Sequence, residues 1–156
     1  MSKPLHDGTY LNAIRGFRNP YRWMSNMYTP CTVTLDGVKY SSVEKAYQAA
    51  KSLDPDHRAR VKHARGPSEA KQLGRHCKVR ENWDGIKLRI MEKLLRQKFA
   101  PGTFYARKLM ATGHCYIEET NWWGDRFWGV CDGKGENHMG VLLMKIRNEL
   151  IEAEEI

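Results

Sequence analysis

Apolar side chains recur at the three- and four-residue spacing of an α-helix along most of the chain, and this pattern constrains the fold most. The longest predicted helix begins at Asn82 or Trp83 and ends before Pro101. A last helix is predicted from about Asn137 to Glu152. Four shorter helices are predicted at residues 41–52, from residue 54 onward, at 66–74 and at 103–111.

Strand signals are few. Residues 32–35 and 38–40 flank Asp36-Gly37, a dipeptide typical of two-residue hairpin turns, and His114–Glu118 is a second candidate strand. Asn121–Gly135 has no period and is expected to be a loop. We therefore predict a predominantly helical α+β fold with a small β-hairpin and a minor sheet. A single domain is expected over residues 9–156, after a flexible N-terminus at 1–8.

The charge is uneven along the chain. There are 26 Lys and Arg residues against 18 Asp and Glu, for a formal net charge of +8. Lys51–Lys98 alone holds 14 basic and 6 acidic residues, so this segment carries the whole excess. A basic region suggests an anionic partner such as nucleic acid, a nucleotide or a sugar phosphate. A solvated helical surface would have the same composition.

No export or membrane signal is visible. Met1–Gly8 lacks the apolar core of a signal peptide, and the longest uncharged apolar run, Val141–Met144, is too short to span a bilayer. We expect a cytoplasmic location and reduced thiols at the four cysteines, which are Cys31, Cys77, Cys115 and Cys131. Their spacings and those of the histidines match no zinc template, so neither a metal nor another cofactor is expected. The oligomeric state stays open, with a monomer as one option.

One predicted helix face combines four polar groups. Glu44, Tyr47, Gln48 and Lys51 stand at positions i, i+3, i+4 and i+7, which brings them to one side of the helix. Such a face can hold a substrate. However, Ser41 stands three residues before Glu44, which is the spacing of a capping box, and spacing alone favours the cap.

A second candidate site lies in the loop. Asn121–Gly129 contains four aromatic residues together with Asp125 and Arg126. Aromatic rings beside charged groups suit stacking on a planar base while a sugar or phosphate is held. The alternative is a loop anchored by its own tryptophans.

A third, weaker candidate is the sequence Gly133-Lys134-Gly135, which leads into the last helix at Asn137. Glycines beside a helix N-terminus can offer backbone N–H groups to an anion, and Lys134 adds positive charge. The full P-loop and dinucleotide-binding patterns are absent from the sequence.

An ordered set of motifs covers the chain from about Phe17 to Leu150 and resembles the NADAR, or YbiA-like, family. The motifs are Ser25-Asn26; Gly37-x-x-Tyr40-x-Ser42-x-Glu44-x-x-Tyr47-Gln48-Ala49-x-Lys51; Ala70-Lys71-x-Leu73-Gly74-Arg75; Arg80-x-x-Trp83-x-x-x-Lys87; Asp125-x-Phe127-Trp128-Gly129; and Gly133-x-Gly135-x-Asn137-x-x-Gly140-x-x-Leu143-Met144-x-x-Arg147. Met27 departs from the pattern, because many members have an aromatic residue there.

The resemblance implies a small, mostly helical fold and cleavage of N-glycosidic bonds. Members of the family release ADP-ribose from modified guanine in nucleic acid or hydrolyse early riboflavin-pathway intermediates. By the same resemblance Glu44, Trp83, Asp125 and Trp128 are the functional residues, and Glu44 is expected to be catalytic rather than only a cap. Trp123 competes with Trp128 for alignment to the family's Trp-Gly motif.

We hypothesise that Glu44 stabilises an oxocarbenium-like centre or activates water, and that Asp125 positions water or binds ribose. Trp83 and Trp128 would stack on the heterocycle and sugar. The groups expected to hold phosphate are Arg18, Arg126, Lys134 and the amides of Gly133–Gly135. The remaining candidate substrate-binding residues are Asn26, Tyr47, Gln48, Lys51, Trp123 and Asn137.

This hypothesis requires the Glu44 helix and the tryptophan loop to share a cleft. The basic segment favours ADP-ribosyl-guanine in nucleic acid over a small phosphoribosylamino riboflavin intermediate. A non-catalytic reader of ADP-ribose or modified nucleic acid would use the same groups without turnover. A plain basic nucleic-acid binder would ignore free ADP-ribose and lose affinity steeply with salt.

Overall fold

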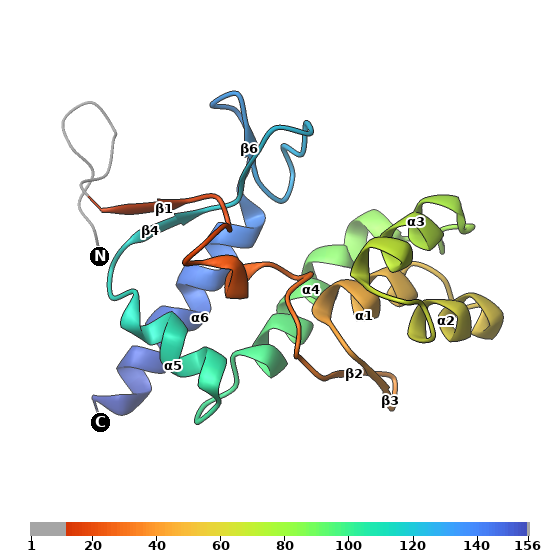
Figure 1. Cartoon of the computed structure of the whole chain (residues 1–156), viewed down its shortest axis with the longest axis horizontal. Coiled ribbons are helices and arrows are strands. Elements are labelled where there is room, and N and C mark those ends of the chain that lie inside the picture. Colours follow the sequence, from red (N-terminus) through yellow and green to blue (C-terminus); the bar gives the residue numbers. More distant parts are fainter. Residues whose placement is uncertain (1–11, 156) are drawn as a thin grey trace. The chain divides into compact units, whose positions relative to one another are not determined.

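The computed structural model describes residues 12–155, so the predicted flexible terminus at residues 1–8 lies outside the described residues. The chain divides into two compact units. Residues 25–98 form one, and residues 12–24 with 99–155 belong to the other. Helices dominate, and the strands of the described residues pair only in twos, which confirms the predicted helical α+β class (Figure 1).

The unit of residues 25–98 begins with the predicted hairpin. Strands β2 (Val33–Leu35) and β3 (Val38–Tyr40) pair antiparallel. Asp36 and Gly37 between them have positive φ angles of 48° and 80°. Two consecutive left-handed residues make the turn whose twist matches paired strands, and Asp-Gly suits it because neither residue is bulky at Cβ.

Four helices complete this unit, as the sequence predicts: α1 (Val43–Ala50), α2 (Pro55–Lys62), α3 (Pro67–His76) and α4 (Trp83–Lys98). Helix α1 packs against the other three (Figure 1). Its fully buried Ala46, Ala49 and Ala50 are small, which lets neighbouring helices approach closely. Helix α3 was predicted to stop near Gly74, but it continues to His76.

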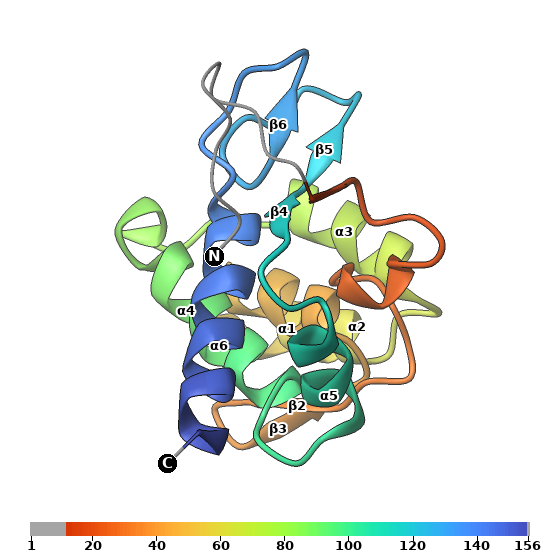
Figure 2. The same cartoon turned by 90° about the vertical axis from the view of Figure 1, so that its left-hand side faces the viewer.

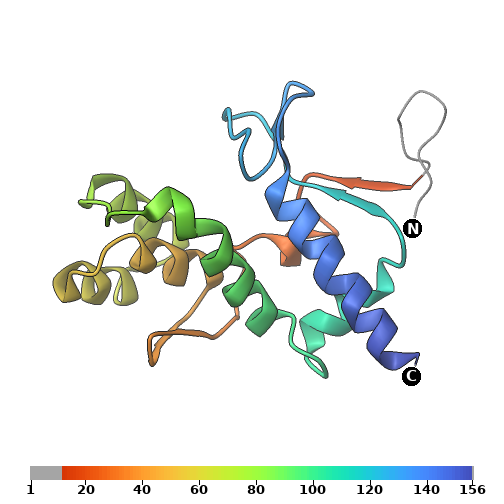
Figure 3. The ribbon, with the colours of Figure 1, turned by 180° about the vertical axis from the view of Figure 1, so that it is seen from behind.

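Of the four strands described in the other unit, only the one at residues 116–118 has a local signal in the sequence. β1 (Ala13–Arg15) pairs parallel with β4 (Tyr116–Glu118), as Figure 3 shows from behind. β5 (Thr120–Asn121) pairs parallel with β6 (Val130–Cys131), and the two lie side by side in Figure 2. The strand expected at 114–118 is therefore confirmed in its second half, while the predicted loop at 121–135 contains two short paired segments.

A short 3₁₀ helix (Arg22–Met24) and helices α5 (Phe104–Ala111) and α6 (His138–Glu154) complete this unit. The hydroxyl of Thr103 accepts a hydrogen bond from the amide of Ala106 and so caps the start of α5. The prediction that the helix starting near Trp83 is the longest is wrong, because α6 has 17 residues and α4 has 16. No helix of the described residues combines the length and apolar character needed to cross a bilayer.

Candidate active site

The start of helix α1 decides what Glu44 can do. The N-cap is Ser42, whose Oγ accepts the amide of Lys45 at 3.0 Å. The predicted capping box with Ser41 as the cap is therefore wrong by one residue, because Lys45 and not Glu44 occupies the third helical position. The amide of Glu44 donates to the carbonyl of Asn26 at 3.0 Å, which ties the helix start to the Ser25-Asn26 segment.

The Glu44 side chain is buried, with 9% of its surface exposed. Its Oε1 accepts a hydrogen bond of 2.7 Å from Nε2 of Gln48, one turn further along the helix. A buried carboxylate loses hydration and requires polar or charged neighbours to remain ionised. Gln48 and Lys51 supply such neighbours on the predicted face.

Lys51 is half-buried at the end of the same face. Burial lowers the pKa of its ammonium group, and the negative charge of Glu44 opposes that shift. Its Nζ lies 5.7 Å from the ring centroid of Tyr47, within the range of a cation–π contact. The four predicted residues of α1 are thus brought together within one electrostatic environment.

Trp83 joins this cluster as the first residue of α4. Its ring centroid lies 5.2 Å from that of Tyr47, and the two rings are tilted by 51°. The residue is buried, so this tryptophan packs at the start of its helix beside the polar face of α1.

Asn26 lies under the same helix. Its Nδ2 is 3.5 Å from the sulfur of Met91, and its buried Oδ1 has no hydrogen-bond partner among the described residues. A buried acceptor of this kind is costly unless it binds something. The Oδ1 atom of Asn26 is thus a buried acceptor without a partner among the described residues, next to the start of α1.

The absence of a side chain at Gly74 gives the amide of Gln48 the space that it occupies. A Cβ atom at this position would collide with Oε1 of Gln48 and approach its Cδ to 2.7 Å. Glycine in the last turns of α3 therefore makes room for the amide that holds Glu44. The sequence prediction took Gly74 as a helix stop and missed this role, although Gly74 stood within a motif of the family resemblance.

In the other unit, Asp125 has a clear structural role. Its Oδ1 accepts the amides of Phe127 at 3.2 Å and Trp128 at 2.9 Å. This geometry is an Asx turn, which closes the loop on itself. A chemical role for Asp125 would therefore use the second carboxylate oxygen.

Asn121 organises the same loop, and the sequence prediction assigned it no role. Its Oδ1 accepts the amide of Asp125 at 3.0 Å, and its Nδ2 donates to the carbonyls of Asp125 at 2.8 Å and Val130 at 3.3 Å. One buried side chain thus replaces the regular hydrogen bonds that an aperiodic segment lacks. The preference of Asn for side chain–backbone bonding is the signal that indicates such a role.

The aromatic residues of the loop divide into two groups. Trp128 is half-buried, and its ring packs edge-on against Phe127 at 4.9 Å and against His138 at 6.5 Å. Trp122 and Trp123 are 86% and 52% exposed and contact each other at 5.7 Å. The loop is anchored by one group of aromatics and displays the other. The assignment of Trp128 to the family's Trp-Gly motif, with Trp123 as the alternative, stays a prediction.

The turn at Gly133–Gly135 is closed by main-chain bonds. Cys131 and Lys134 exchange two hydrogen bonds of 2.9 and 3.1 Å. The four amides of residues 136–139 donate to carbonyls of residues 126–129, so the loop itself caps the start of α6. Those amides are not available to an anion, and the predicted phosphate role of this turn depends on the Lys134 ammonium and on the Gly133 and Gly135 amides.

The remaining predicted residues have local roles. Asn137, in a left-handed conformation, accepts the amide of Glu119 and donates to the carbonyl of Ile117. Nε of Arg126 lies 3.4 Å from the carbonyl oxygen of Cys131, and Arg18 is exposed. No group of His, Cys, Asp and Glu side chains that could hold a metal occurs within residues 12–155.

The structure thus brings the predicted residues together as two clusters. Glu44, Tyr47, Gln48, Lys51 and Trp83 form one in the unit of residues 25–98. The Asn121–Asn137 loop forms the other. The expected cleft shared by the two clusters stays a prediction.

Comparison with known proteins gives the same family as the motifs. The model of the NADAR domain matches residues 14–151 of the chain. The N-glycosidase YbiA of Shigella boydii is 34% identical over 122 residues, which cover 76% of this chain and 75% of that protein. The solved structure of Escherichia coli YbiA superposes with a TM-score of 0.78 at 30% identity and covers 92% of this chain and 87% of that one.

A riboflavin biosynthesis protein of Vibrio vulnificus is 35% identical over 133 residues. The match covers 83% of this chain but 36% of that protein, so the chain spans about a third of that relative's length.

Proposed function

Because the chain belongs to the NADAR domain family, we propose that it is an N-glycosidase that hydrolyses a ribosyl C1′–N bond. We propose ADP-ribosylated guanine in nucleic acid as its substrate and free ADP-ribose as the product. The name of the YbiA relatives supports the reaction type. The charge of this chain supports the choice of substrate.

One observation carries the proposal: Glu44 is a buried carboxylate that does not serve as the capping-box residue of its helix. It lies instead on a face with an amide, an ammonium group and two aromatic rings. Breaking a ribosyl C1′–N bond develops positive charge on the sugar, and carboxylates stabilise that charge in glycosidases.

The reaction balances with water alone. The electron pair of the C1′–N bond leaves with the base, and a water oxygen forms the new bond to C1′. The water loses one proton and the leaving base gains one, so the reaction requires no other reactant. Glu44 stabilises the sugar cation or accepts the water proton, and Asp125 orients water or a ribose hydroxyl through its second oxygen.

The other candidate residues bind the substrate in this proposal. Trp83 and Trp128 stack on the heterocycle and the sugar, while Arg18, Arg126 and Lys134 hold phosphate. Gln48 keeps the Glu44 carboxylate in place through its 2.7 Å hydrogen bond.

The basic segment supports nucleic acid as the substrate. Lys51–Lys98 holds 14 basic and 6 acidic residues. A polyanion gains more from such a surface than a substrate with one phosphate, because each neutralised phosphate releases counterions.

A second candidate substrate is a phosphoribosylamino intermediate of riboflavin biosynthesis. The printed name of the Vibrio relative favours it. Assaying both substrates side by side decides between the two. Higher kcat/KM on the riboflavin intermediate would overturn the choice of ADP-ribosyl-guanine and leave the glycosidase reaction in place.

The test of the reaction is Glu44→Gln, which keeps the shape and removes the charge. We expect kcat for release of ADP-ribose to fall by about a hundredfold or more, with the fold intact by circular dichroism. Glu69→Gln is the matched control, because Glu69 is a carboxylate of α3 that accepts the exposed amide of Arg65 before the helix, and the activity of this variant should stay near that of the wild type. Near wild-type turnover in Glu44→Gln would leave Glu44 a structural residue, and no turnover by the wild type would favour a reader of ADP-ribose.

A further inference from the structure

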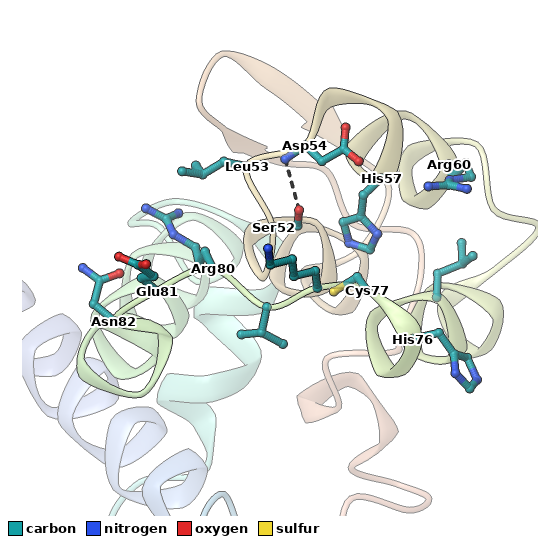
Figure 4. A pocket seen from close by; sticks show the side chains of 13 residues that line it. Ser52, Leu53, Asp54, His57, Arg60, His76, Cys77, Arg80, Glu81 and Asn82 are labelled. Atoms are coloured by element: carbon teal, nitrogen blue, oxygen red, sulfur yellow. Dashed lines mark hydrogen bonds between the residues drawn. The ribbon is translucent and has the colours of Figure 1, made fainter.

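A cavity of about 880 Å³ lies in the unit of residues 25–98 and includes none of the predicted site residues in its lining. It is formed by α2, the end of α3 and the segments that follow α1 and α3 (Figure 4). Arg60 and Arg80 lie on opposite sides of it, with His57 and Cys77 between them. A volume of this size accommodates a nucleotide unit rather than a single small anion.

The cations that line the cavity are poorly neutralised. None of the ion pairs within residues 12–155 involves Arg60 or Lys78. Arg80 acts electrostatically on Asp36, but Asp36 is already held by Arg58 at 2.7 Å.

The acidic residues of the lining offset this charge only in part. The Asp54 carboxylate accepts the amide of Asp56 and caps α2, so one of its oxygens is occupied. Glu81 is the other acid. Three cations of the lining, of which Arg60 and Lys78 are exposed and Arg80 is half-buried, therefore exceed its two acidic groups.

The walls of the cavity are held by buried hydrogen bonds. The buried His57 ring lies with Nε2 3.0 Å from the carbonyl oxygen of Gln48. The amide of Arg80 donates to the carbonyl of Lys51 at 2.7 Å. Both bonds attach the lining to the last turn of α1, the helix that carries Glu44.

The cavity and the Glu44 cluster are therefore neighbours within one unit. Asn82 lines the cavity, and the next residue, Trp83, contacts Tyr47. The lining of the cavity is thus joined to the Glu44 cluster through the Asn82–Trp83 link and through the backbone at the end of α1.

The lining indicates which part of a nucleotide would bind. In the described chain it includes no Phe, Tyr or Trp, so it offers no stacking platform for a base. It offers guanidinium and ammonium groups, which bind phosphate oxygens with charge-assisted hydrogen bonds.

We infer that this cavity binds the phosphodiester backbone of the nucleic-acid strand next to the modified nucleotide. The statement that this strand is a substrate rests on the proposed function. Binding of a strand to the cavity can be measured without any turnover.

The first test measures binding of an unmodified, fluorescently labelled single-stranded oligonucleotide by anisotropy at several salt concentrations. In Arg60→Gln/Lys78→Gln/Arg80→Gln we expect affinity to fall about tenfold or more near 0.1 M salt. We expect the slope of log K against log salt to decrease by about 2, since each lost phosphate contact removes about 0.7.

The matched control is Lys39→Gln/Lys62→Gln/Arg89→Gln, which removes the same charge from exposed positions outside the cavity. An equal loss of affinity in this control, or no loss in the cavity variant, would overturn the inference. Arg60→Gln alone serves as a milder variant, because Arg60 is exposed and its replacement should not affect folding.

The second test compares two substrates of the proposed reaction, ADP-ribosylated DNA and the ADP-ribosylated guanosine nucleoside. The cavity variant should raise KM for the DNA about tenfold and leave the nucleoside reaction unchanged. Equal loss on both would mean that the cavity holds the substrate's own ribosyl phosphates, which contradicts the inference. If the wild type cleaves neither, the proposed function fails, while the anisotropy result still decides whether the cavity binds a strand.

Discussion

At the residue scale, Gly74 and Gln48 show how the absence of a side chain shapes the candidate active site. Gly74 lies in a helix with ordinary φ, so its value is space rather than backbone freedom. The amide of Gln48 fills that space, is 3% exposed and holds Glu44. A buried side chain in such contact cannot move aside cheaply.

We predict that Gly74→Ala lowers the free energy of unfolding by about 1–3 kcal/mol, because the new methyl group displaces Gln48. It should also reduce kcat, since Gln48 holds the Glu44 carboxylate. The measurements are urea unfolding and steady-state turnover.

The control is the same substitution in a Gln48→Ala background. There the methyl group has room, and Ala in place of Gly in a helix should stabilise by up to about 1 kcal/mol. Equal destabilisation in both backgrounds would show that the cost of Gly74→Ala does not come from Gln48.

At single residues, the prediction was right for the side chains that helical spacing places on one face. It was wrong for the N-cap of α1, which it placed one residue too early. The face of Glu44, Tyr47, Gln48 and Lys51 follows from a period of 3.6. The cap did not, because two adjacent serines offer the same hydroxyl and only the tertiary position of Asn26 selects Ser42.

At the scale of elements, the loop of residues 121–135 is ordered by side chain–backbone bonds together with main-chain bonds. Asn121 and Asp125 bind its main chain from within, and the carbonyls of residues 126–129 cap α6. The loop is therefore a rigid platform from which Trp122 and Trp123 extend.

Asn121→Ala should destabilise this platform. It leaves the Asp125 amide and two carbonyls without their partner, at a cost of about 1–3 kcal/mol. We expect faster hydrogen exchange at the Asp125, Phe127 and Trp128 amides, measured by NMR or mass spectrometry.

Trp122→Ala is the matched comparison in the same loop, because its side chain is 86% exposed and contributes little to packing. It should leave the exchange rates and the free energy of unfolding near those of the wild type. Comparable protection in Asn121→Ala and the wild type would refute the platform role of Asn121.

Elements with local signals were predicted well and elements formed by distant contacts were not. Asp36-Gly37 determines the β2–β3 turn from two residues, and Thr103 caps α5 from one. The β1–β4 pair joins segments about a hundred residues apart, so the local sequence of one strand does not indicate which segment it pairs with. The cavity was missed for the same reason, although its cations lie in the basic segment.

At the scale of the whole molecule, the excess of positive charge links stability to pH. The formal charge of +8 at pH 7 falls toward zero near the sequence pI of about 9.4, which reduces self-repulsion. Lys98 adds a specific contribution. Burial lowers the pKa of its ammonium group from 10.5 to about 8, and Nζ donates to the carbonyl of Ser25.

The direction in which the free energy of unfolding changes with pH follows from the number of protons that each state binds. Between pH 8 and 10.5 the unfolded chain holds the Lys98 proton and the folded chain has lost it, so stability rises with pH in this window. Deprotonation of Lys98 raises the free energy of unfolding by at most about 3 kcal/mol across this window. Cys31 acts in the opposite direction, because burial raises the pKa of its thiol and the unfolded chain loses that proton first.

We therefore predict that Lys98→Met flattens the rise of unfolding free energy between pH 7 and 10, measured by denaturant unfolding. Cys31→Ser as the common background removes the opposing thiol from the comparison. Parallel pH curves for Lys98→Met and its parent would contradict a buried, readily deprotonated Lys98.

The parallel β1–β4 pair bears on where a recombinant version of this domain should begin. The family match starts at residue 14, inside β1, and the carbonyl of Asn12 accepts the amide of Tyr116 at 3.1 Å. A protein trimmed to the match would lose that bond and Ala13, one of the three residues of the strand. The start of β4, at Tyr116, would then have an unpaired backbone edge, the type of surface through which separate molecules join and precipitate.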